Sequence, residues 1–444
     1  MTSSTRALAA WSSLVAASGS AVLAAAPSES PFSQPQPAFY GQVRPRLELN
    51  HKALADTSHS AAYTLLRSRL GFMAVTSEFS EVKIELQDAR VLGNEPVTGL
   101  NQSSTTTGNS KGVDLTQGYG ALEYLFGESN SLKAAFGRMK MSLGAGRYLS
   151  TLEWSPTARP FDGFATNLRI DKLNVTGFGF LVRDTTSYAN VLANGVYNQL
   201  WGAYASLPLS DSATIEAGAF YDMGRQANLV PLTPDTTANH DIATLDGRAV
   251  AKFGPVAIEQ EILYQTGEVN ANKKGDVDVA AWYTSTRIGV VLPMGKLNLG
   301  LDAMSGDGDA KDMELNQYRA QYWFAHSYFG WMDYFLNNPK YGVVDYRVDA
   351  DVPVGEFASV KAQYHYFTPQ IATDNGAKLK AYGQEIDAEI HVTRIPKTLL
   401  VLGAGVFLPG DGAYLLPGAL TQLASSAVKT GPGYFVYFQP AFNF

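Results

Sequence analysis

The sequence predicts an all-β protein, specifically a transmembrane antiparallel up-and-down β-barrel of about 18 strands with short periplasmic turns and long extracellular loops. Three observations predict it: polar and apolar residues alternate along most of the chain, its connections alternate between tight and long, and its last segment is amphipathic and ends on an aromatic residue. The composition, 45% hydrophobic and 17% charged, is too polar for a bundle of membrane helices but suits strands that face lipid with every second residue.

The first 26 residues have the pattern of a secretory signal peptide: one basic residue, Arg6, then an apolar stretch, then small residues at Ala24 and Ala26. A disordered leader is the alternative. After Ala26 no apolar run of about 18 residues follows, so no helix is expected to span a membrane. We expect residues 27–37 to form a short periplasmic segment and residues 38–444 a single barrel domain in the bacterial outer membrane.

The alternation is clearest in residues 38–50, where one face of a strand would be polar and the other apolar. The polar face carries Tyr40, Gln42, Arg44, Arg46, Glu48 and Asn50, and the apolar face carries Phe39, Val43, Leu47 and Leu49. The next segment opposes Arg67 and Arg69 to Leu66, Leu70 and Phe72. One face of each strand is therefore expected to meet water and the other lipid.

The connections give the strand count. Tight links are expected near 77–79, 127–131, 171–172, 209–212, 254–255, 293–296, 354–355 and 395–397. Longer polar stretches lie near 51–63, 93–113, 143–160, 184–195, 224–243, 268–276, 306–341, 369–380 and 409–432. Eight tight and nine long links make seventeen connections and eighteen strands, and an even number lets the barrel close without unpaired edges in lipid.

The final segment, GPGYFVYFQPAFNF, resembles the C-terminal signal by which outer-membrane barrels are assembled. We expect Phe442 and Phe444 to form this assembly signal and the barrel assembly machinery to be a partner. An ordinary terminal strand would explain the alternation but not the terminal Phe444. Pro440 fits only where the ladder does not need its missing N–H.

Strand parity assigns the charged residues of the lumen, and they segregate along the chain. Because consecutive strands are neighbours, one wall is predicted to be basic and the opposite wall acidic, and such a field orients polar solutes. The alternative is that these charges only keep a water-filled lumen hydrated. The predicted basic ladder consists of Arg44, Arg46, Arg67, Arg69, Lys83, Arg138, Lys140 and Arg169. The predicted acidic strip consists of Glu259, Glu261, Asp345, Asp349, Asp351, Glu385, Asp387 and Glu389, with Arg248, Lys252, Arg347 and Lys361 as later basic exceptions.

Residues 136–164, 301–335 and 383–413, with 84–93, resemble the alginate export family of porin-like outer-membrane proteins. The resemblance is carried by Gly137–Arg138, Trp154, Phe161–Gly163, Ser305–Asp307, Glu385, Asp387 and Phe407–Gly410. It implies an eighteen-stranded barrel that exports an anionic uronate polymer along the basic ladder. Arg90 would join this path only if a bulge shifted its parity relative to Lys83.

The expected function is an outer-membrane pore or export conduit that passes polar solutes, polyuronates such as alginate among them, through a charged lumen. A general diffusion porin is the alternative, because the late carboxylates would repel uronates. An outer-membrane hydrolase and a secreted soluble carbohydrate-binding β-protein are the other rivals. The expected partners are outer-membrane lipid and a polar or anionic solute or polysaccharide; whether the barrel is a monomer or a trimer stays open.

No enzyme activity, cofactor or metal is expected. There is no cysteine, and the six histidines fall in predicted loops or among polar lining residues. Asp307, Asp309 and Asp312 lack the full calcium-loop pattern. The net charge of −7 argues against a nucleic-acid partner.

The stretch 306–341 is too aromatic for a wholly exposed extracellular loop. Its aromatic residues are Trp323, Phe324, Tyr328, Phe329, Trp331, Tyr334 and Phe335. We therefore expect it to fold inward or over the mouth and to gate the pore.

Overall fold

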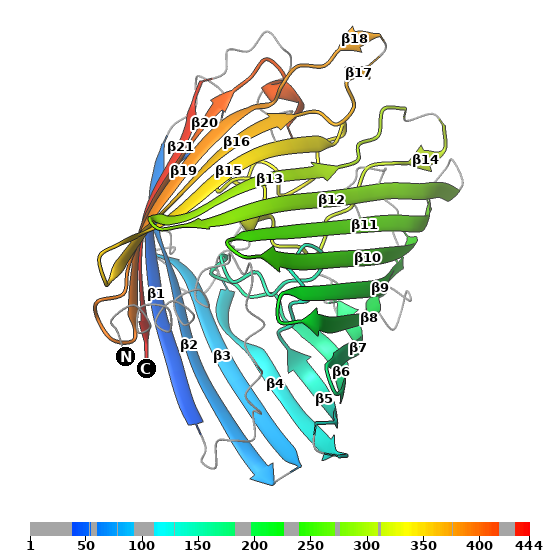
Figure 1. The fold of residues 1–444 in the computed structure, drawn as a ribbon, viewed down its shortest axis with the longest axis vertical. Helices are drawn as coiled ribbons and strands as arrows, with labels where there is room; N and C mark the ends of the chain where they lie inside the picture. The colour runs from blue at the N-terminus through cyan, green and yellow to red at the C-terminus, as the bar shows by residue number, and fades with distance from the viewer. Residues whose placement is uncertain are drawn as a thin grey trace, which may run out of the picture.

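The computed structural model describes residues 38–52, 54, 60–77, 79–92, 111–127, 129–182, 197–225, 239–270, 276–309, 312–374, 376–416 and 431–444. The predicted signal peptide and the predicted segment 27–37 lie outside these residues. Long antiparallel strands wrap around a central space that holds loop segments (Figure 1).

The strands have the following bounds. The first half of the barrel is β1 (Ala38–His51), β2 (Ala61–Ser77), β3 (Ser80–Leu92), β4 (Lys111–Leu125), β5 (Ser131–Met139), β6 (Phe161–Ile170), β7 (Leu173–Val182), β8 (Tyr197–Ser210) and β9 (Ala213–Arg225). The second half is β10 (His240–Phe253), β11 (Val256–Asn270), β12 (Asp276–Leu292), β13 (Gly295–Met304), β15 (Val343–Val354), β16 (Ala358–Thr368), β19 (Gly383–Val392), β20 (Thr398–Pro409) and β21 (Gly433–Asn443). The loops carry β14 (Glu314–Leu315), β17 (Thr373–Asp374), β18 (Ala377–Lys378) and the 3-10 turns η3 (Ala325–Ser327) and η4 (Ala413–Leu415).

The barrel is closed, because the first strand pairs with the last. β1 and β21 are antiparallel, with Leu47 opposite Phe438. The described residues form a sheet of nineteen strands, of which β14 has only two residues and pairs parallel to β12, so eighteen strands make the wall. The predicted eighteen-stranded barrel is confirmed, and each predicted tight link falls between two paired strands.

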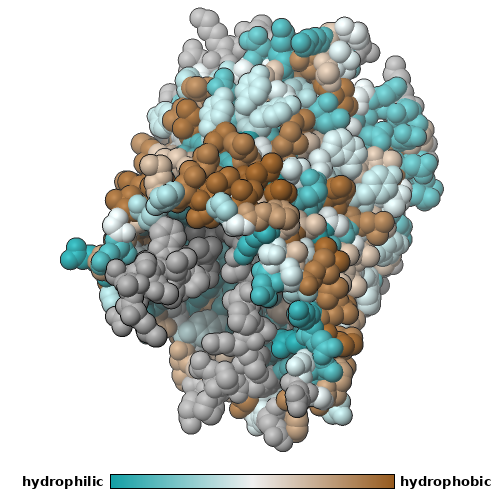
Figure 2. All heavy atoms as spheres, viewed as in Figure 1, coloured by the Kyte–Doolittle hydropathy of each residue, from teal (hydrophilic) through white to brown (hydrophobic). Residues whose placement is uncertain are grey.

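The outer face of the wall is apolar, as strand parity predicted. Leu47 and Phe136 are 55% and 59% exposed, whereas Arg46 and Glu48, the neighbours of Leu47 at lumen parity, are each only 4% exposed. Figure 2 shows apolar side chains gathered across the wall, with hydrophilic residues toward the ends of the strands. Such a face suits hydrocarbon and not water. Within the described ranges, no helix is long and apolar enough to cross a membrane.

The terminal strand faces both environments as expected. Phe438 and Phe442 are exposed on the outer face, whereas Phe435 and Tyr437 are buried toward the lumen. Phe444 exchanges two backbone hydrogen bonds with Gly41 of β1, at 2.9 and 3.0 Å. The last residue therefore completes the seam between the first and last strands. Its role as an assembly signal stays a prediction.

Two prolines interrupt this seam. The pairing of β1 with β21 is interrupted between Val43↔Phe442 and Leu47↔Phe438. The register is the same on both sides of this gap, and it places Pro45 opposite Pro440. Gly41 and Phe444 form a hydrogen-bonded pair, and such pairs recur at every second position of an antiparallel ladder. Pro45 and Pro440 therefore meet at a hydrogen-bonding position where neither has an N–H to donate.

We expect Pro45→Val combined with Pro440→Val to stabilise the barrel by about 1 kcal/mol. The change supplies two ladder donors, each worth about 1 kcal/mol, and part of that gain offsets the added freedom of the unfolded chain. The measurement is the temperature at which the detergent-solubilised barrel loses its compact form on an unboiled gel. Each single substitution supplies one donor and should give about half the gain, and an unchanged midpoint for the double variant would contradict the assignment of the gap.

Candidate functional site

Four arginines on β1 and β2 form the centre of the basic ladder. Arg44, Arg46, Arg67 and Arg69 face the lumen because they alternate with exposed apolar residues on the same strands. The register places Arg44 opposite Arg67. All four side chains are largely buried. Like charges packed this closely require partners of negative charge or partial charge.

Those partners come from the long connection between β5 and β6, residues 140–160, which we call the crossbar. Arg44 donates hydrogen bonds to the backbone carbonyls of Glu153, Trp154 and Ser155 at 2.8–3.1 Å. Arg46 donates to the carbonyl of Trp154 at 2.9 Å, and its guanidinium lies 3.9 Å from the centre of the Trp154 ring. Three consecutive carbonyls of the crossbar therefore accept hydrogen bonds from the ladder.

The carboxylate of Glu153 lies among three cations. It is 2.7 Å from Arg69 Nη1, 3.0 Å from Arg67 Nη1 and 3.3 Å from Lys140 Nζ. Partial burial opposes ionisation of this group, but the charges of Arg69, Arg67 and Lys140 outweigh it and lower the pKa of Glu153 to about 2. The ladder thus already holds a carboxylate, which the chain itself supplies.

The other end of the crossbar is inserted into the acidic strip. Arg147 Nη1 lies 2.6 Å from Glu259 Oε1 and also pairs with Glu261, both on β11. Its Nε is 3.9 Å from Asp302 on β13, and its guanidinium is 4.5 Å from the centre of the Tyr328 ring. The Arg147 side chain is fully buried; burial opposes its charge, but Glu261 and the neighbouring groups raise its pKa well above the usual range.

The crossbar spans the full width of the lumen. In the ring of eighteen wall strands, β2 and β11 are nine strands apart, so they lie on opposite walls. Arg147 binds the acidic wall and Glu153 binds the basic wall. The crossbar therefore carries each charge at the wall of opposite sign, and the segregated wall charges hold it in place.

A second loop connects β13 to β15, and its residues 316–342, which we call the aromatic loop, turn into the barrel. As its composition predicted, Trp323, Phe329 and Phe335 are buried, at 4%, 1% and 0% exposure. It pairs with the crossbar through backbone hydrogen bonds from Ser150 N to Tyr322 O, at 2.9 Å, and from Phe324 N to Gly146 O, at 3.1 Å. The inward fold agrees with the prediction, whereas gating stays a prediction.

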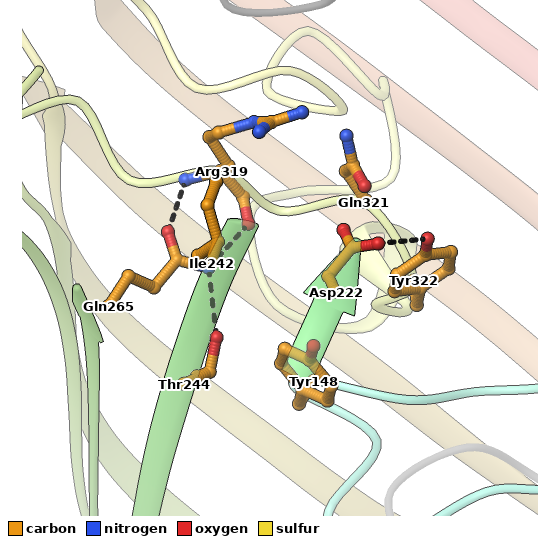
Figure 3. Close-up of a pocket in the computed structure, with 8 residues that line it drawn as sticks. All are labelled: Tyr148, Asp222, Ile242, Thr244, Gln265, Arg319, Gln321 and Tyr322. Carbon is orange, nitrogen blue, oxygen red and sulfur yellow. Dashed lines mark hydrogen bonds between the residues drawn. The ribbon is translucent and has the colours of Figure 1, made fainter. Parts of the chain in front are cut away.

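The aromatic loop is fastened to the wall formed by β9, β10 and β11 (Figure 3). Gln265 on β11 accepts a hydrogen bond from Arg319 N at 2.8 Å and donates one to Arg319 O at 3.0 Å. Tyr322 donates to Asp222 at 3.2 Å, and Tyr148 of the crossbar lines the same small cavity. A polar cavity of about 360 Å³ opens beside this contact, between the ends of β7 and β8 and residues 318–322 and 337–338.

Most carboxylates of the acidic strip are engaged by groups of the chain itself. Met332 N and Trp331 N of the aromatic loop donate to Glu385 and Asp387, at 2.7 and 3.4 Å. The remaining contacts are His365 to Asp345 at 2.8 Å, Arg347 to Asp302 and Asp349 at 3.4 and 3.6 Å, and His391 to Glu389 at 2.7 Å. These contacts direct carboxylate oxygens toward donors of the chain, which lowers the repulsion toward anionic solutes that the sequence alone suggested.

The aromatic loop is also tied to the seam side of the barrel. Asp333 lies 2.9 Å from His326 Nδ1 and 3.4 Å from Lys52 Nζ. Burial opposes the charge of Asp333, but His326 and Lys52 lower its pKa to about 2. The His326 ring stacks on Trp154, with 3.9 Å between ring centres, so the two inward loops meet at this point.

Arg138, which was assigned to the ladder, and Arg90, which was to join it through a bulge, are both on the outer face, so their assignment to the lumen is wrong. Arg138 lies opposite Asp162 and binds it at 2.5 and 2.6 Å, and Phe136, two residues earlier, is exposed to the outside. Arg90 lies opposite Leu66 and pairs with Asp88 at 2.7 Å. A bulge between β3 and β4 is present, but the β2–β3 register runs unshifted through Arg90.

The reason for the Arg138 error is local. Lys140 lies beyond the end of β5, so strand parity cannot be carried from it to Arg138. Lys140 itself reaches into the lumen, 2.9 Å from Glu85. Lys83 and Arg169 keep their predicted places: Lys83 lies 5.6 Å from the centre of the Tyr40 ring, and Arg169 lies opposite Ser131 near the tight-turn end.

Sequence reasoning missed Arg147 and Glu153, the two residues that fasten the crossbar. Residues 143–160 were assigned to an extracellular loop, and a loop has no periodicity that assigns side chains to a face. A weak signal was present, since two glycines come just before Arg147, and both adopt positive φ, 51° at Gly144 and 77° at Gly146. They allow the tight turn that directs Arg147 into the acidic strip.

We expect the ion pairs of Glu153 and Asp333 to persist from neutral pH down to about pH 4. The pKa values of Glu153 and Asp333, about 2 each, are below the ordinary carboxyl value of about 4. Their contribution to stability is therefore fully present above the ordinary value and is lost as the pH falls through about 2. The difference in single-channel conductance between the native chain and Glu153→Gln, recorded from pH 7 downward, checks this for Glu153, and a difference that vanished near pH 5 would contradict it.

A closed barrel with an apolar outer face and a charged lumen defines an outer-membrane pore protein. Residues 36–414 match the family model described as alginate export, and the chain belongs to that family. It is accordingly a transport channel of the bacterial outer membrane and not an enzyme. No curated protein sequence matches it.

Solved outer-membrane structures share the fold at low identity. OccK8 (OprE) of Pseudomonas aeruginosa has 9% identity and a TM-score of 0.58, over 92% of this chain and 98% of that chain. OccAB4 of Acinetobacter baumannii has 11% identity and a TM-score of 0.55, over 94% of this chain and 100% of that chain. OpdK of Pseudomonas aeruginosa, solved with vanillate, has 12% identity and a TM-score of 0.55, over 91% and 98%.

Proposed function

We propose that this outer-membrane channel passes polar solutes that carry carboxylates, uronates and polyuronates among them, along the basic ladder of its lumen. One observation carries the proposal: Arg67, Arg69 and Lys140 all bind the carboxylate of Glu153. A wall that holds one carboxylate in this manner has the chemistry to hold those of a solute.

The balance of charge supports the proposal. Five cations gather here, Arg44, Arg46, Arg67, Arg69 and Lys140, and among the described residues the carboxylates paired with them are Glu48, Glu85 and Glu153. The cluster therefore keeps a surplus of positive charge. Among the described residues of this cluster, Arg67 Nε and Arg69 Nη2 are buried donors without a hydrogen-bond partner. Unused donors of this kind favour an anionic ligand.

The position of the ladder also favours passage over storage. Its residues lie at successive levels of neighbouring strands, so an anion can exchange between weak sites, and conduction requires sites that bind without retaining. OpdK, a barrel of this fold, was solved with vanillate, a molecule that carries a carboxylate. We also propose that the barrel assembly machinery recognises Phe442 and Phe444 and is a partner of the chain during its insertion into the membrane.

The test is single-channel recording of the refolded protein in planar bilayers, with polyuronate titrated against a neutral oligosaccharide of similar length. We expect polyuronate to block the current and added salt to relieve the block, because screening weakens charge-mediated binding. Neutral oligosaccharide should block less at equal concentration. Equal effects of the two polymers would overturn the proposal and favour a general diffusion porin.

A further inference from the structure

The environment of Glu153 is that of a bound ligand. Its carboxylate receives charged hydrogen bonds from Arg67 and Arg69 on β2, and Lys140 approaches from the side. The arginines are almost fully buried, yet the Glu153 side chain is 42% exposed. Glu153 is therefore the part of this contact that solvent reaches, and a carboxylate from the lumen that displaced it would meet the same cations without a change in net charge.

The two ends of the crossbar differ in how firmly they are held. Arg147 is fully buried, with Glu259 and Glu261 around it, so its release would leave these two carboxylates buried in the wall without it. The contact of Glu153 with the basic wall is partly open to solvent. A solute that enters the lumen therefore meets a crossbar with one fixed end, at Arg147, and one exchangeable end, at Glu153.

We infer that Arg67, Arg69 and Lys140 form a carboxylate-binding site that the chain's own Glu153 occupies, and that a solute carboxylate, a uronate in the proposed function, displaces it. This inference rests on the proposed function and deepens it. Displacement frees residues 153–155, and Arg44 and Arg46 then lose their carbonyl partners and become available to the next carboxylate of a polymer.

Trp154 couples this exchange to the aromatic loop. Its ring lies between the Arg46 guanidinium and the His326 ring, each 3.9 Å away. When residues 153–155 leave the ladder, Trp154 must leave both neighbours. The same step therefore weakens the contact between the crossbar and the aromatic loop.

The first variant that tests the inference is Glu153→Gln, which keeps the shape of the side chain and removes its charge. Without an internal competitor, galacturonate should bind at least about tenfold more tightly than to the native chain, measured by titration calorimetry in detergent. Asp162→Asn is the matched control, since Asp162 is also paired with an arginine but lies on the outer face. It should leave galacturonate binding unchanged.

A second measurement does not depend on the folding of that variant. The chain has no cysteine, so Ser155→Cys introduces a single thiol at the end of the displaced segment. Galacturonate and polyuronate should each increase the rate at which a water-soluble thiol reagent labels it, and galactose should not. Monomer and polymer acting alike would assign the effect to the carboxylate and not to chain length.

The outcomes separate the inference from the proposed function. If Arg67→Gln weakens galacturonate binding but Glu153→Gln binds as the native chain does and labelling ignores galacturonate, the inference fails and the proposed function stands. If no variant binds galacturonate or polyuronate, the proposed function itself fails. Tighter binding by Glu153→Gln together with uronate-dependent labelling supports both.

Discussion

Arg147→Met is expected to lower the free energy of unfolding of the barrel by about 3–5 kcal/mol, because it removes one partner of a buried charge cluster and leaves the others uncompensated. Glu259 and Glu261 are both 2% exposed in their side chains and depend on Arg147 and Arg248 for neutralisation. The crossbar would also lose its fixed end, so the single-channel current should become larger and noisier. Unfolding by urea in detergent micelles measures the first effect.

The control for this prediction is Arg225→Gln. Arg225 pairs with Asp241 at 2.7 Å, but the two side chains are 32% and 39% exposed, so the pair contributes little. The expected loss for this variant is below about 1 kcal/mol. If Arg147→Met cost no more than Arg225→Gln, the buried cluster would not be what anchors the crossbar.

The second large effect is expected from Arg67→Gln combined with Arg69→Gln. These residues supply the charged hydrogen bonds to Glu153, and each such bond contributes about 1.5–3 kcal/mol. The double variant should therefore raise the half-blocking concentration of polyuronate by about a hundredfold or more. It should also release residues 153–155 and increase the open-channel current.

Arg138→Gln is the matched control for the double variant, since Arg138 was predicted to share the ladder and instead lies on the outer face with Asp162. We expect its polyuronate block to equal that of the native chain. A block that survives in the double variant but is lost in Arg138→Gln would show that the anion path runs elsewhere.

The wall of the barrel could be predicted from the sequence because its signals are local. A strand exposes every second residue, so the exposed Leu47 and the buried Arg46 appear as an alternation within a few residues. The tight turns are similarly short. The separation of basic and acidic walls followed from the order of consecutive strands.

The contents of the lumen could not be predicted by the same reasoning. Arg147 meets Glu259, and Glu153 meets Arg67, across more than eighty positions of chain. No spacing rule joins a loop residue to a strand on the opposite wall. The aromatic loop was the exception, because a loop rich in large aromatic side chains is expected to be buried. The crossbar is fastened by one arginine, Arg147, and one glutamate, Glu153, and two such residues give no comparable signal in the composition.

The measurement that tests the central claim most directly is the zero-current potential of the native channel across a bilayer with a gradient of potassium chloride. A lumen whose acidic strip is engaged by the chain and whose basic ladder keeps surplus charge should select for anions, and the potential should move toward zero in the Arg67→Gln, Arg69→Gln variant. A cation-selective potential, or the same potential in both proteins, would contradict the account.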